Sequence, residues 1–185
     1  MKGYNHTTYA ILGLLTIGCH SGYAIKQMID QSLNHFWKIS YGQIYPTLKQ
    51  LVQDDLATVE ETSQEGKPHK KEYFITSKGE AELREWLQSP IDAIPVEKNN
   101  VLLKLFFSRH QPHDHTIAHL EAYKQKLQAH YHTYETIEQM IVSQLHEEKD
   151  APYWLFTLDY GKRVTAAAVD WCSDTIQKLN DWEEI

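Results

Sequence analysis

The chain has 185 residues and a mass of 21.6 kDa, which is enough for one large domain or two small ones. Hydrophobic residues make up 42% and charged residues 23%, as in ordinary globular proteins, which excludes a disordered tail or a fibrous repeat. No apolar run approaches the ~20 residues that a membrane span needs, so an integral membrane protein is excluded. The two cysteines, Cys19 and Cys172, lie far apart, and the N-terminus does not have the features of a signal peptide. We therefore expect a reduced, cytoplasmic protein.

The net charge of −7 is unevenly distributed along the chain. Residues 1–79 hold eight lysines, no arginine and seven acidic residues, whereas residues 80–185 hold ten basic and eighteen acidic residues. The overall pI of 5.8 weighs against nucleic-acid binding. A DNA-binding domain needs only a local basic surface, however, so the near-neutral first part leaves DNA binding open.

Two helices are predicted at the start of the chain. The first runs from about His6 to Ile17, and Gly18 supplies a residue suited to end it. The second begins after Ser21, which is a good N-cap residue, and buries apolar residues at helical spacing.

The third helix is predicted to begin near Ser40, because Ser40 and Gln43 have the spacing of a capping box. Apolar residues then recur at i, i+4 and i+7 and form one buried stripe. The remaining residues of this helix are expected to face outward; they are Gln43, Tyr45, Pro46, Thr47, Lys49 and Gln50.

Two strand-like segments, Leu56–Glu61 and Glu72–Thr76, flank a polar stretch that contains several lysines. They predict a β-hairpin with a long basic tip. Ser77–Glu80 has the spacing of a second capping box and opens a helix through Leu87. The order of these elements over residues 1–88 predicts a winged helix-turn-helix domain, whose third helix can enter a major groove while the hairpin tip lies along the neighbouring backbone.

A linker is predicted at residues 89–97, where Pro90 and Pro95 prevent a continuous helix. Residues 98–185 look all-helical, with predicted helices at Asn99–Arg109, after Pro112, and from Pro152 to Trp182. The middle helix carries an imperfect coiled-coil stripe, which Lys124 and Glu138 interrupt. The last helix is apolar over much of its surface, so we expect a partner subunit to cover it.

Several segments together match the pattern of a known family; they are Tyr9–Leu15, Ser21–Ile25, Phe36-Trp37, Gly42–Leu48, Lys71–Thr76 with Gly79, Leu83–Leu87 and Glu97–Phe107. The chain resembles the PadR-type transcriptional regulators, in the longer branch that is similar to the phenolic-acid repressors. The resemblance implies a mainly α-helical protein with an N-terminal winged helix-turn-helix domain and an all-helical C-terminal dimerisation domain. It also implies a homodimeric repressor of palindromic operators, which a small aromatic molecule releases in several relatives.

Contacts to double-stranded DNA are expected from the third helix and from the hairpin tip, through Tyr41, Gln43, Tyr45, Pro46, Thr47, Lys49, Lys67, His69, Lys70 and Lys71. For the lysines of the tip, a solvated run of charge is the alternative interpretation. Residues 1–79 contain no arginine, so the bidentate contact of arginine with guanine is absent. Sequence preference must then come from glutamine, tyrosine, apolar contacts or DNA shape.

An effector pocket formed by Trp37, Tyr153 and Trp154 is a further hypothesis, and ordinary core packing explains these aromatic residues equally well. Eleven histidines include a cluster at His113, His115 and His119, but no glutamate or cysteine completes a familiar ligand set. We predict no metal site and no cofactor. The motifs of nucleophilic and nucleotide-dependent enzymes are absent, so we predict no enzyme activity.

Two rival interpretations stay open at this stage. A protein–protein interaction module could retain the winged-helix shape without binding DNA, and the net charge of −7 supports it. A histidine metal sensor is the second rival. Salt dependence separates the first rival from DNA binding, because counterion release makes genuine DNA binding fall steeply as salt rises.

Overall fold

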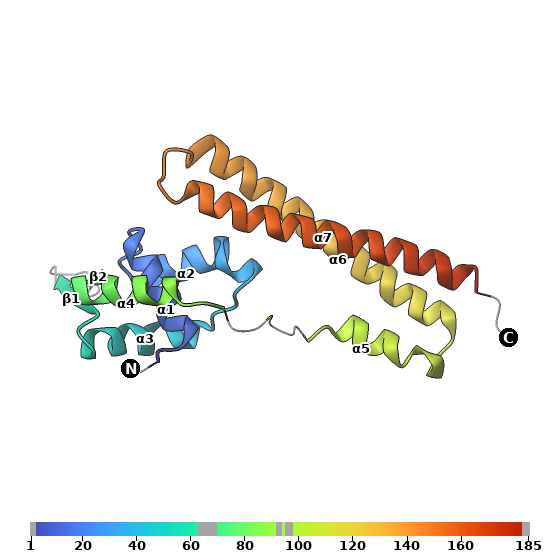
Figure 1. Ribbon diagram of the computed structural model, residues 1–185, viewed down its shortest axis with the longest axis horizontal. Coiled ribbons are helices and arrows are strands. Elements are labelled where there is room, and N and C mark those ends of the chain that lie inside the picture. Colours follow the sequence, from blue (N-terminus) through green and yellow to red (C-terminus); the bar gives the residue numbers. More distant parts are fainter. Residues whose placement is uncertain (1–2, 63–69, 92–93, 95–97, 183–185) are drawn as a thin grey trace. The chain divides into compact units, whose positions relative to one another are not determined.

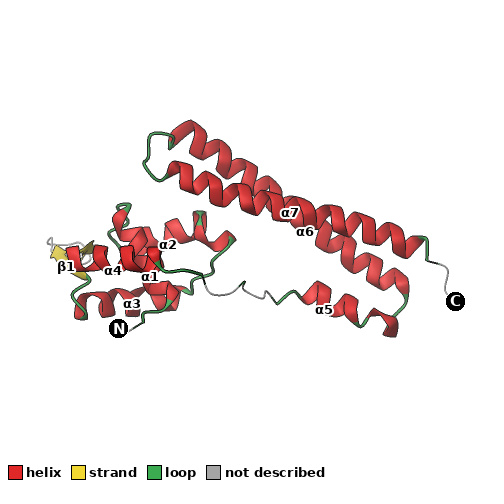
Figure 2. Ribbon diagram, in the orientation of Figure 1, coloured by secondary structure: helices red, strands yellow, loops and turns green. Residues whose placement is uncertain are grey.

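The computed structural model describes residues 3–62, 70–91, 94 and 98–182 of the chain. They divide into two compact units with bounds Met1–Ile94 and Pro95–Ile185 (Figure 1). Figure 2 shows that the described part is mainly helical, with one small sheet in the first unit. The mainly α-helical, winged-helix fold predicted from the sequence is confirmed.

The first two helices, α1 (His6–Thr16) and α2 (Gly22–Gln31), are joined by a turn that the sequence anticipates. Gly18 adopts a φ of 88°, a left-handed conformation that favours glycine. The amides of Gly18 and Cys19 donate to the carbonyls of Leu15 and Leu14, which is the Schellman pattern for ending a helix. Ser21 then caps α2 by accepting a hydrogen bond from the Ala24 amide at 3.1 Å.

A short 3-10 helix, η1 (Leu33–His35), leads into α3 (Tyr41–Gln53). The predicted capping box is present, since the Gln43 side chain accepts from the Ser40 amide at 3.3 Å. Pro46 lies inside α3, and the helix continues through it.

The α3 helix ends in a turn that also decides where the first strand begins. The amide of Leu56 donates to the Leu51 carbonyl at 2.8 Å, while Asp55 takes a φ of 58°. This is again the Schellman pattern, with aspartate where glycine is usual. Leu56 therefore belongs to the helix end, which is why β1 (Ala57–Thr62) begins one residue later than predicted.

The second strand, β2 (Lys70–Ile75), pairs antiparallel with β1, so that Ala57 lies opposite Ile75. The predicted strand Glu72–Thr76 begins two residues too late and ends one residue too late. Thr76 is not a strand residue but the N-cap of the next helix. The other edge of β2 bonds to the turn after α1, where the Tyr73 amide donates to the His20 carbonyl at 2.7 Å. This bond attaches the hairpin to the helical core.

The fourth helix, α4 (Ser77–Gln88), is capped by Thr76, whose hydroxyl accepts from the Gly79 amide at 3.1 Å. The N-cap of α4 is therefore Thr76, one residue before the predicted N-cap Ser77. The start of α4 presses against the end of α3: the Thr76 amide donates to the Leu56 carbonyl, and a Cβ placed on Gly79 would lie 2.2 Å from that oxygen. Only glycine fits this contact.

The core of the first unit lies between α1, α2, α3 and the hairpin. Its largest fully buried side chains come from every one of these helices and from the α3–β1 turn; they are Ile11, Leu12, Leu15, Ile25, Ile29, Ile44, Leu48, Leu51 and Leu56. Burial of this apolar set is the main force that fixes α3 against α1 and α2.

The second unit contains α5 (Asn100–Phe106), the 3-10 helix η2 (Ser108–His110), α6 (His113–Gln144) and α7 (Ala151–Asn180). The predicted helix over residues 99–109 is thus divided into α5 and η2, and α7 ends two residues before the predicted Trp182. The long helices α6 and α7 pack side by side (Figures 1 and 2). Glu138, which interrupts the apolar stripe of α6, accepts a hydrogen bond from Lys162 of α7 at 2.6 Å.

Both cysteines are free and buried, one in each unit, and burial raises the pKa of each thiol. None of the helices in the described ranges is long and apolar enough to span a membrane. The predicted linker at residues 89–97 stays a prediction, because residues 92–93 and 95–97 lie outside the described ranges.

Replacing Gly79 with alanine is expected to destabilise the first unit. The added Cβ would overlap the Leu56 carbonyl oxygen, and relief requires α4 to move away from the α3–β1 turn. We expect the free energy of unfolding to fall by about 2 kcal/mol or more, measured by urea denaturation followed by circular dichroism.

The matched control is Gly13→Ala in α1, where no atom outside the helix lies within 4 Å of the added Cβ. That change should raise the free energy of unfolding by about 0.5–1 kcal/mol, because alanine is the better helix former. Equal effects of the two substitutions would contradict the close approach at Gly79.

Candidate nucleic-acid interface

The outward face of α3 is exposed and polar, as predicted. Gln43, Pro46 and Lys49 are exposed, and the two tyrosines Tyr41 and Tyr45 remain 46% and 62% exposed. Large aromatic side chains with this exposure contribute little to the core of their own domain. They are free to contact another molecule.

Thr47 is the one α3 residue that was placed on the wrong side. It was predicted to face outward, but its side chain is only 8% exposed. The helical period explains this: Thr47 lies three residues after Ile44 and four before Leu51, so it shares their buried face. Thr47 is thus a core residue at the edge of the stripe, and its predicted outward position was wrong.

Tyr41 is held by two residues of α2. Its hydroxyl donates a hydrogen bond to the Asp30 carboxylate, and the Lys26 ammonium lies 4.5 Å from the centre of its ring. The hydrogen bond to Asp30, followed by desolvation, raises the pKa of Tyr41, because both favour the neutral phenol. The position of this ring is therefore set before any ligand arrives.

Tyr45 lies over the start of α2. A Cβ placed on Gly22 would lie 2.6 Å from Tyr45 Cε1, so the ring rests where any larger residue would have its side chain. Gly22 directly follows the N-cap Ser21 and has no positive φ to explain its presence. The close approach of the Tyr45 ring supplies the reason for glycine.

Sequence reasoning missed Lys26 and Asp30 as members of this surface. A signal was available, because Tyr23, Lys26 and Asp30 follow one another at i, i+3 and i+7. All three are exposed and form one face of α2, beside the face of its buried residues. The candidate surface thus joins α3 to one face of α2.

The structure describes the hairpin tip only in part. Lys67 and His69 lie outside the described residues, and for Lys70 only the backbone in β2 is described. Lys71 forms a salt bridge with Glu61 across the hairpin, with 2.7 Å between Nζ and Oε1, and this hydrogen bond raises the pKa of Lys71. Its charge is partly compensated before any contact with phosphate.

The three aromatic residues of the effector hypothesis come from different units. Trp37 belongs to the first unit, where the centre of its ring lies 5.2 Å from the centre of the His6 ring. Tyr153 and Trp154 open α7 in the second unit; Tyr153 is 68% exposed, and Trp154 packs against the cluster around Tyr134. Two cavities, both within residues 98–182, are lined by other side chains.

The histidine cluster gathers no ligand set. Within the described ranges, no group of three histidine, cysteine, aspartate or glutamate side chains could hold a metal ion. Two histidines have other neighbours: the His113 ring packs 5.8 Å from that of Trp182, and His132 bonds to Glu135 at 2.8 Å.

Two families match successive parts of the sequence. Residues 11–85 match the family described as "Transcriptional regulator PadR-like family", and residues 97–180 match "Virulence activator alpha C-term". Residues 11–85 of the chain thus belong to the PadR-like family of transcriptional regulators. The family predicted from the sequence motifs is confirmed.

Relatives and solved structures agree with this assignment. The "Negative transcriptional regulator PadR" of Bacillus subtilis (strain 168) is 39% identical over 99 residues, which is 54% of either chain. The chain thus aligns with about half the length of this curated relative. The crystal structure of Bacillus subtilis PadR in complex with operator DNA has a TM-score of 0.84 at 27% identity, covering 95% of this chain and 99% of that chain. The complex of the same protein with p-coumaric acid has a TM-score of 0.77 at 25% identity, covering 94% and 98%.

Replacing Asp30 with asparagine is expected to lower the pKa of Tyr41 towards the ordinary tyrosine value of about 10. The hydrogen bond to a carboxylate favours the protonated phenol, so its contribution to stability is fully present below about pH 10 and is lost as the pH rises through the raised pKa. The measurement is an NMR titration of tyrosine labelled at Cζ, with Tyr41→Phe used to assign the signal. A Tyr41 pKa that is unchanged in Asp30→Asn would contradict the hydrogen bond.

Proposed function

We propose that the protein is a homodimeric repressor that binds a palindromic operator through residues 1–88. The exposed face of α3 carries the proposal, since Tyr41, Gln43 and Tyr45 project from a helix whose other face is anchored in the core. A helix that is fixed on one side and polar and aromatic on the other suits the major groove. The similarity to a PadR structure in complex with operator DNA supports this orientation.

The residue types of this face indicate how DNA would be read. Gln43 can donate to and accept from adenine in the major groove, and the tyrosine hydroxyls can bond to phosphates. Lys49 of α3, together with Lys67, His69, Lys70 and Lys71 of the hairpin, would neutralise phosphates. Because residues 1–79 contain no arginine, sequence preference would come from glutamine, tyrosine, apolar contacts or DNA shape.

Residues 98–185 would form the dimerisation domain, connected by the linker at 89–97. In this unit, α5 exposes Leu103 and Phe106, its C-cap Phe107 is also exposed, and α7 exposes Phe156 and Tyr160. Exposed apolar residues in this number mark a protein interface. A symmetric dimer that covers them would fix the separation of the two α3 helices, which must match the spacing of the half-sites.

A small aromatic effector would release the repressor from DNA. The complex of Bacillus subtilis PadR with p-coumaric acid supports an effector of this class. The hypothesis that Trp37, Tyr153 and Trp154 bind it stands as a proposal. The protein would act in the cytoplasm, without enzymatic activity of its own, and an effector would work by shifting the population of DNA-competent dimers.

The proposed function is tested by fluorescence anisotropy with the promoter upstream of the protein's own gene, against scrambled DNA, at two salt concentrations. We expect promoter-selective binding that weakens steeply with salt. Lys49→Gln should lower the affinity for both DNAs and reduce the slope of log K against log salt by about 1, since one phosphate contact is lost. Lys178→Gln, an equal charge change at the exposed end of α7, is the control and should have no effect.

Weak binding that is equal for both DNAs would contradict the repressor proposal. It would favour the interaction module that keeps the winged-helix fold without binding DNA.

Gly22→Ala is expected to weaken DNA binding while leaving the fold intact. The new methyl group would occupy the place of the Tyr45 ring, and this exposed side chain can swing away without disturbing the core. We expect the affinity for promoter DNA to fall by about tenfold, without a decrease in the free energy of unfolding.

Gly13→Ala serves as the control for this substitution, because it adds a methyl group in α1 far from any close contact. Promoter affinity that is the same in Gly22→Ala and in the wild type would show that the position of the Tyr45 ring does not matter for DNA binding.

A further inference from the structure

The proton of the Tyr41 hydroxyl decides what this side chain can bind. A tyrosine hydroxyl has one O–H donor, and its oxygen can also accept hydrogen bonds. In the folded domain the donor is already used, because Tyr41 donates to the Asp30 carboxylate. This hydrogen bond is the main reason that the pKa of Tyr41 is raised, so the phenol keeps its proton at neutral pH. What the hydroxyl still offers to another molecule is its oxygen, as an acceptor.

The carboxylate and the ring are both held in place by their neighbours. Asn34 of η1 donates from Nδ2 to Asp30 Oδ1 at 3.0 Å, and the same oxygen accepts the bond from Tyr41. Lys26 lies one turn before Asp30 on α2 and places its ammonium 4.5 Å from the centre of the Tyr41 ring. Tyr41 and Asp30 therefore form a fixed acceptor pair, consisting of the phenol oxygen and the carboxylate.

Both members of the acceptor pair are exposed where a recognition helix contacts DNA. Tyr41 is 46% exposed and is the first residue of α3, and Asp30 is exposed on α2 beside it. In helix-turn-helix complexes the N-terminal residues of the recognition helix contact base edges. A ligand that reaches the start of α3 thus meets oxygen acceptors and one negative charge.

A phosphate does not complement the acceptor pair. Phosphate oxygens are acceptors with negative charge, so they gain no hydrogen bond from a hydroxyl whose proton is used, and the carboxylate repels them. The donors in the major groove are the exocyclic amino groups, N4 of cytosine and N6 of adenine, whereas guanine and thymine present the carbonyl oxygens O6 and O4. Cytosine is the better match, because the amino group of adenine lies beside the acceptor N7.

We propose that the Tyr41–Asp30 acceptor pair reads an exocyclic amino group in the major groove, that of cytosine in preference to that of adenine. Guanine and thymine are rejected at this position. Tyr41 then determines sequence specificity, and Asp30 fixes the direction of its proton.

This inference rests on the proposed function and deepens it. In the proposed function either tyrosine hydroxyl of α3 can bond to a phosphate, whereas the acceptor pair leaves that role to Tyr45 alone. No described residue bonds to the Tyr45 hydroxyl, so its proton can be donated. The two tyrosines of one helix would therefore have different roles, base reading for Tyr41 and phosphate binding for Tyr45.

The test compares base preferences. The full-length wild type, Tyr41→Phe and Asp30→Ala each select sequences from a random library of double-stranded DNA, and the bound pools are sequenced. We expect the wild type to select cytosine, then adenine, at one position of each half-site. In Tyr41→Phe the ratio of these two bases to guanine and thymine should fall about tenfold at that position only. In Asp30→Ala the hydroxyl can donate again, so guanine and thymine should become tolerated there.

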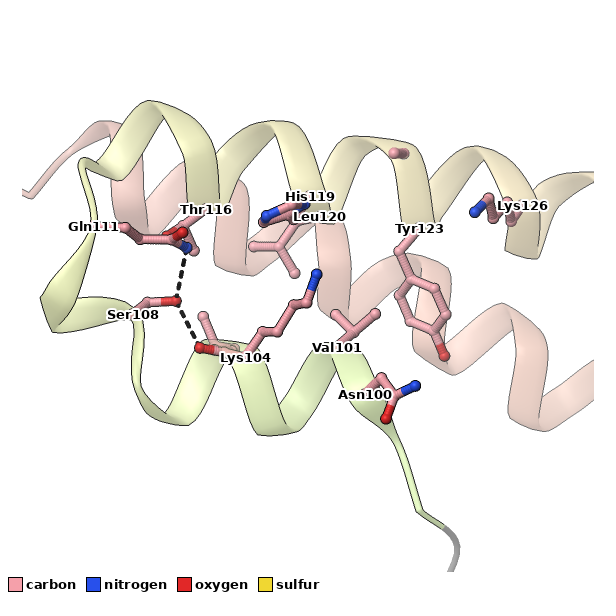
Figure 3. A pocket seen from close by; sticks show the side chains of 12 residues that line it. Asn100, Val101, Lys104, Ser108, Gln111, Thr116, His119, Leu120, Tyr123 and Lys126 are labelled. Atoms are coloured by element: carbon pink, nitrogen blue, oxygen red, sulfur yellow. Dashed lines mark hydrogen bonds between the residues drawn. The ribbon is translucent and has the colours of Figure 1, made fainter.

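Two further variants show whether the effect is specific to the acceptor pair. Tyr45→Phe removes a hydroxyl that can donate to a phosphate, so it should weaken binding to all sequences about equally and keep the base preference. Tyr123→Phe removes a hydroxyl from α6 in the second unit, where the side chain lines the cavity between α5 and α6 (Figure 3). It should select the same sequences as the wild type.

Two results would overturn this proposal alone. One is a Tyr41→Phe protein that selects the same bases as the wild type, and the other is a Tyr41→Phe protein that binds every sequence more weakly by the same factor, as the loss of a phosphate contact predicts. Circular dichroism melting shows whether each variant retains its fold. A wild type that selects no sequence would overturn the proposed function and this inference together, so the two failures are distinguishable.

Discussion

The burial of one face of α3 against α1 and α2 is the constraint on which the candidate interface depends. Ile44, Leu48 and Leu51 are almost completely buried, so rotation of α3 about its axis would expose apolar surface at a cost of about 25 cal/mol per Å². The helix is thereby fixed with Tyr41 and Tyr45 pointing outward. The contacts of these rings with α2 then fix the side chains themselves, through the Asp30 carboxylate in one case and the bare backbone of Gly22 in the other. Rigid aromatic groups on an anchored helix lose little entropy on binding.

Charge alone would not identify this surface. Residues 1–79 hold eight lysines, no arginine and seven acidic residues, and Lys71 is already paired with Glu61. A surface of this kind gains less affinity from phosphates than a lysine- and arginine-rich domain does, so a larger share must come from contacts in the groove and from the spacing of two copies. The proposed dimerisation would therefore have an energetic role, because two modest half-site contacts add when one rigid unit presents both.

Local signals in the sequence were strong enough to predict most of the helices and the hairpin. Ser21, Ser40 and Gly18 occur where helix ends require these residue types, and the buried stripe of α3 follows from its spacing. The errors arose where tertiary contacts decide. Thr47 lies at the edge of a helical face, where spacing alone is ambiguous, and Asp55 takes a left-handed conformation that usually calls for glycine. The roles of Gly22, Lys26 and Asp30 depend on what packs across from them, which one element's sequence does not contain.

The polar residues of the second unit illustrate the same limit in a different way. Glu138 looks like a defect in the apolar stripe of α6, yet it pairs with Lys162 of α7, whose ammonium also lies 5.8 Å from the Tyr131 ring. A half-buried pair of this kind adds little net stability, but any sliding of α7 along α6 would separate the two charges. The pair therefore favours one register of the two long helices, alongside the apolar contacts of Tyr134, Ile141 and Leu158. A fixed register in turn fixes which apolar side chains of α7 lie on the outer face, where a second subunit would pack.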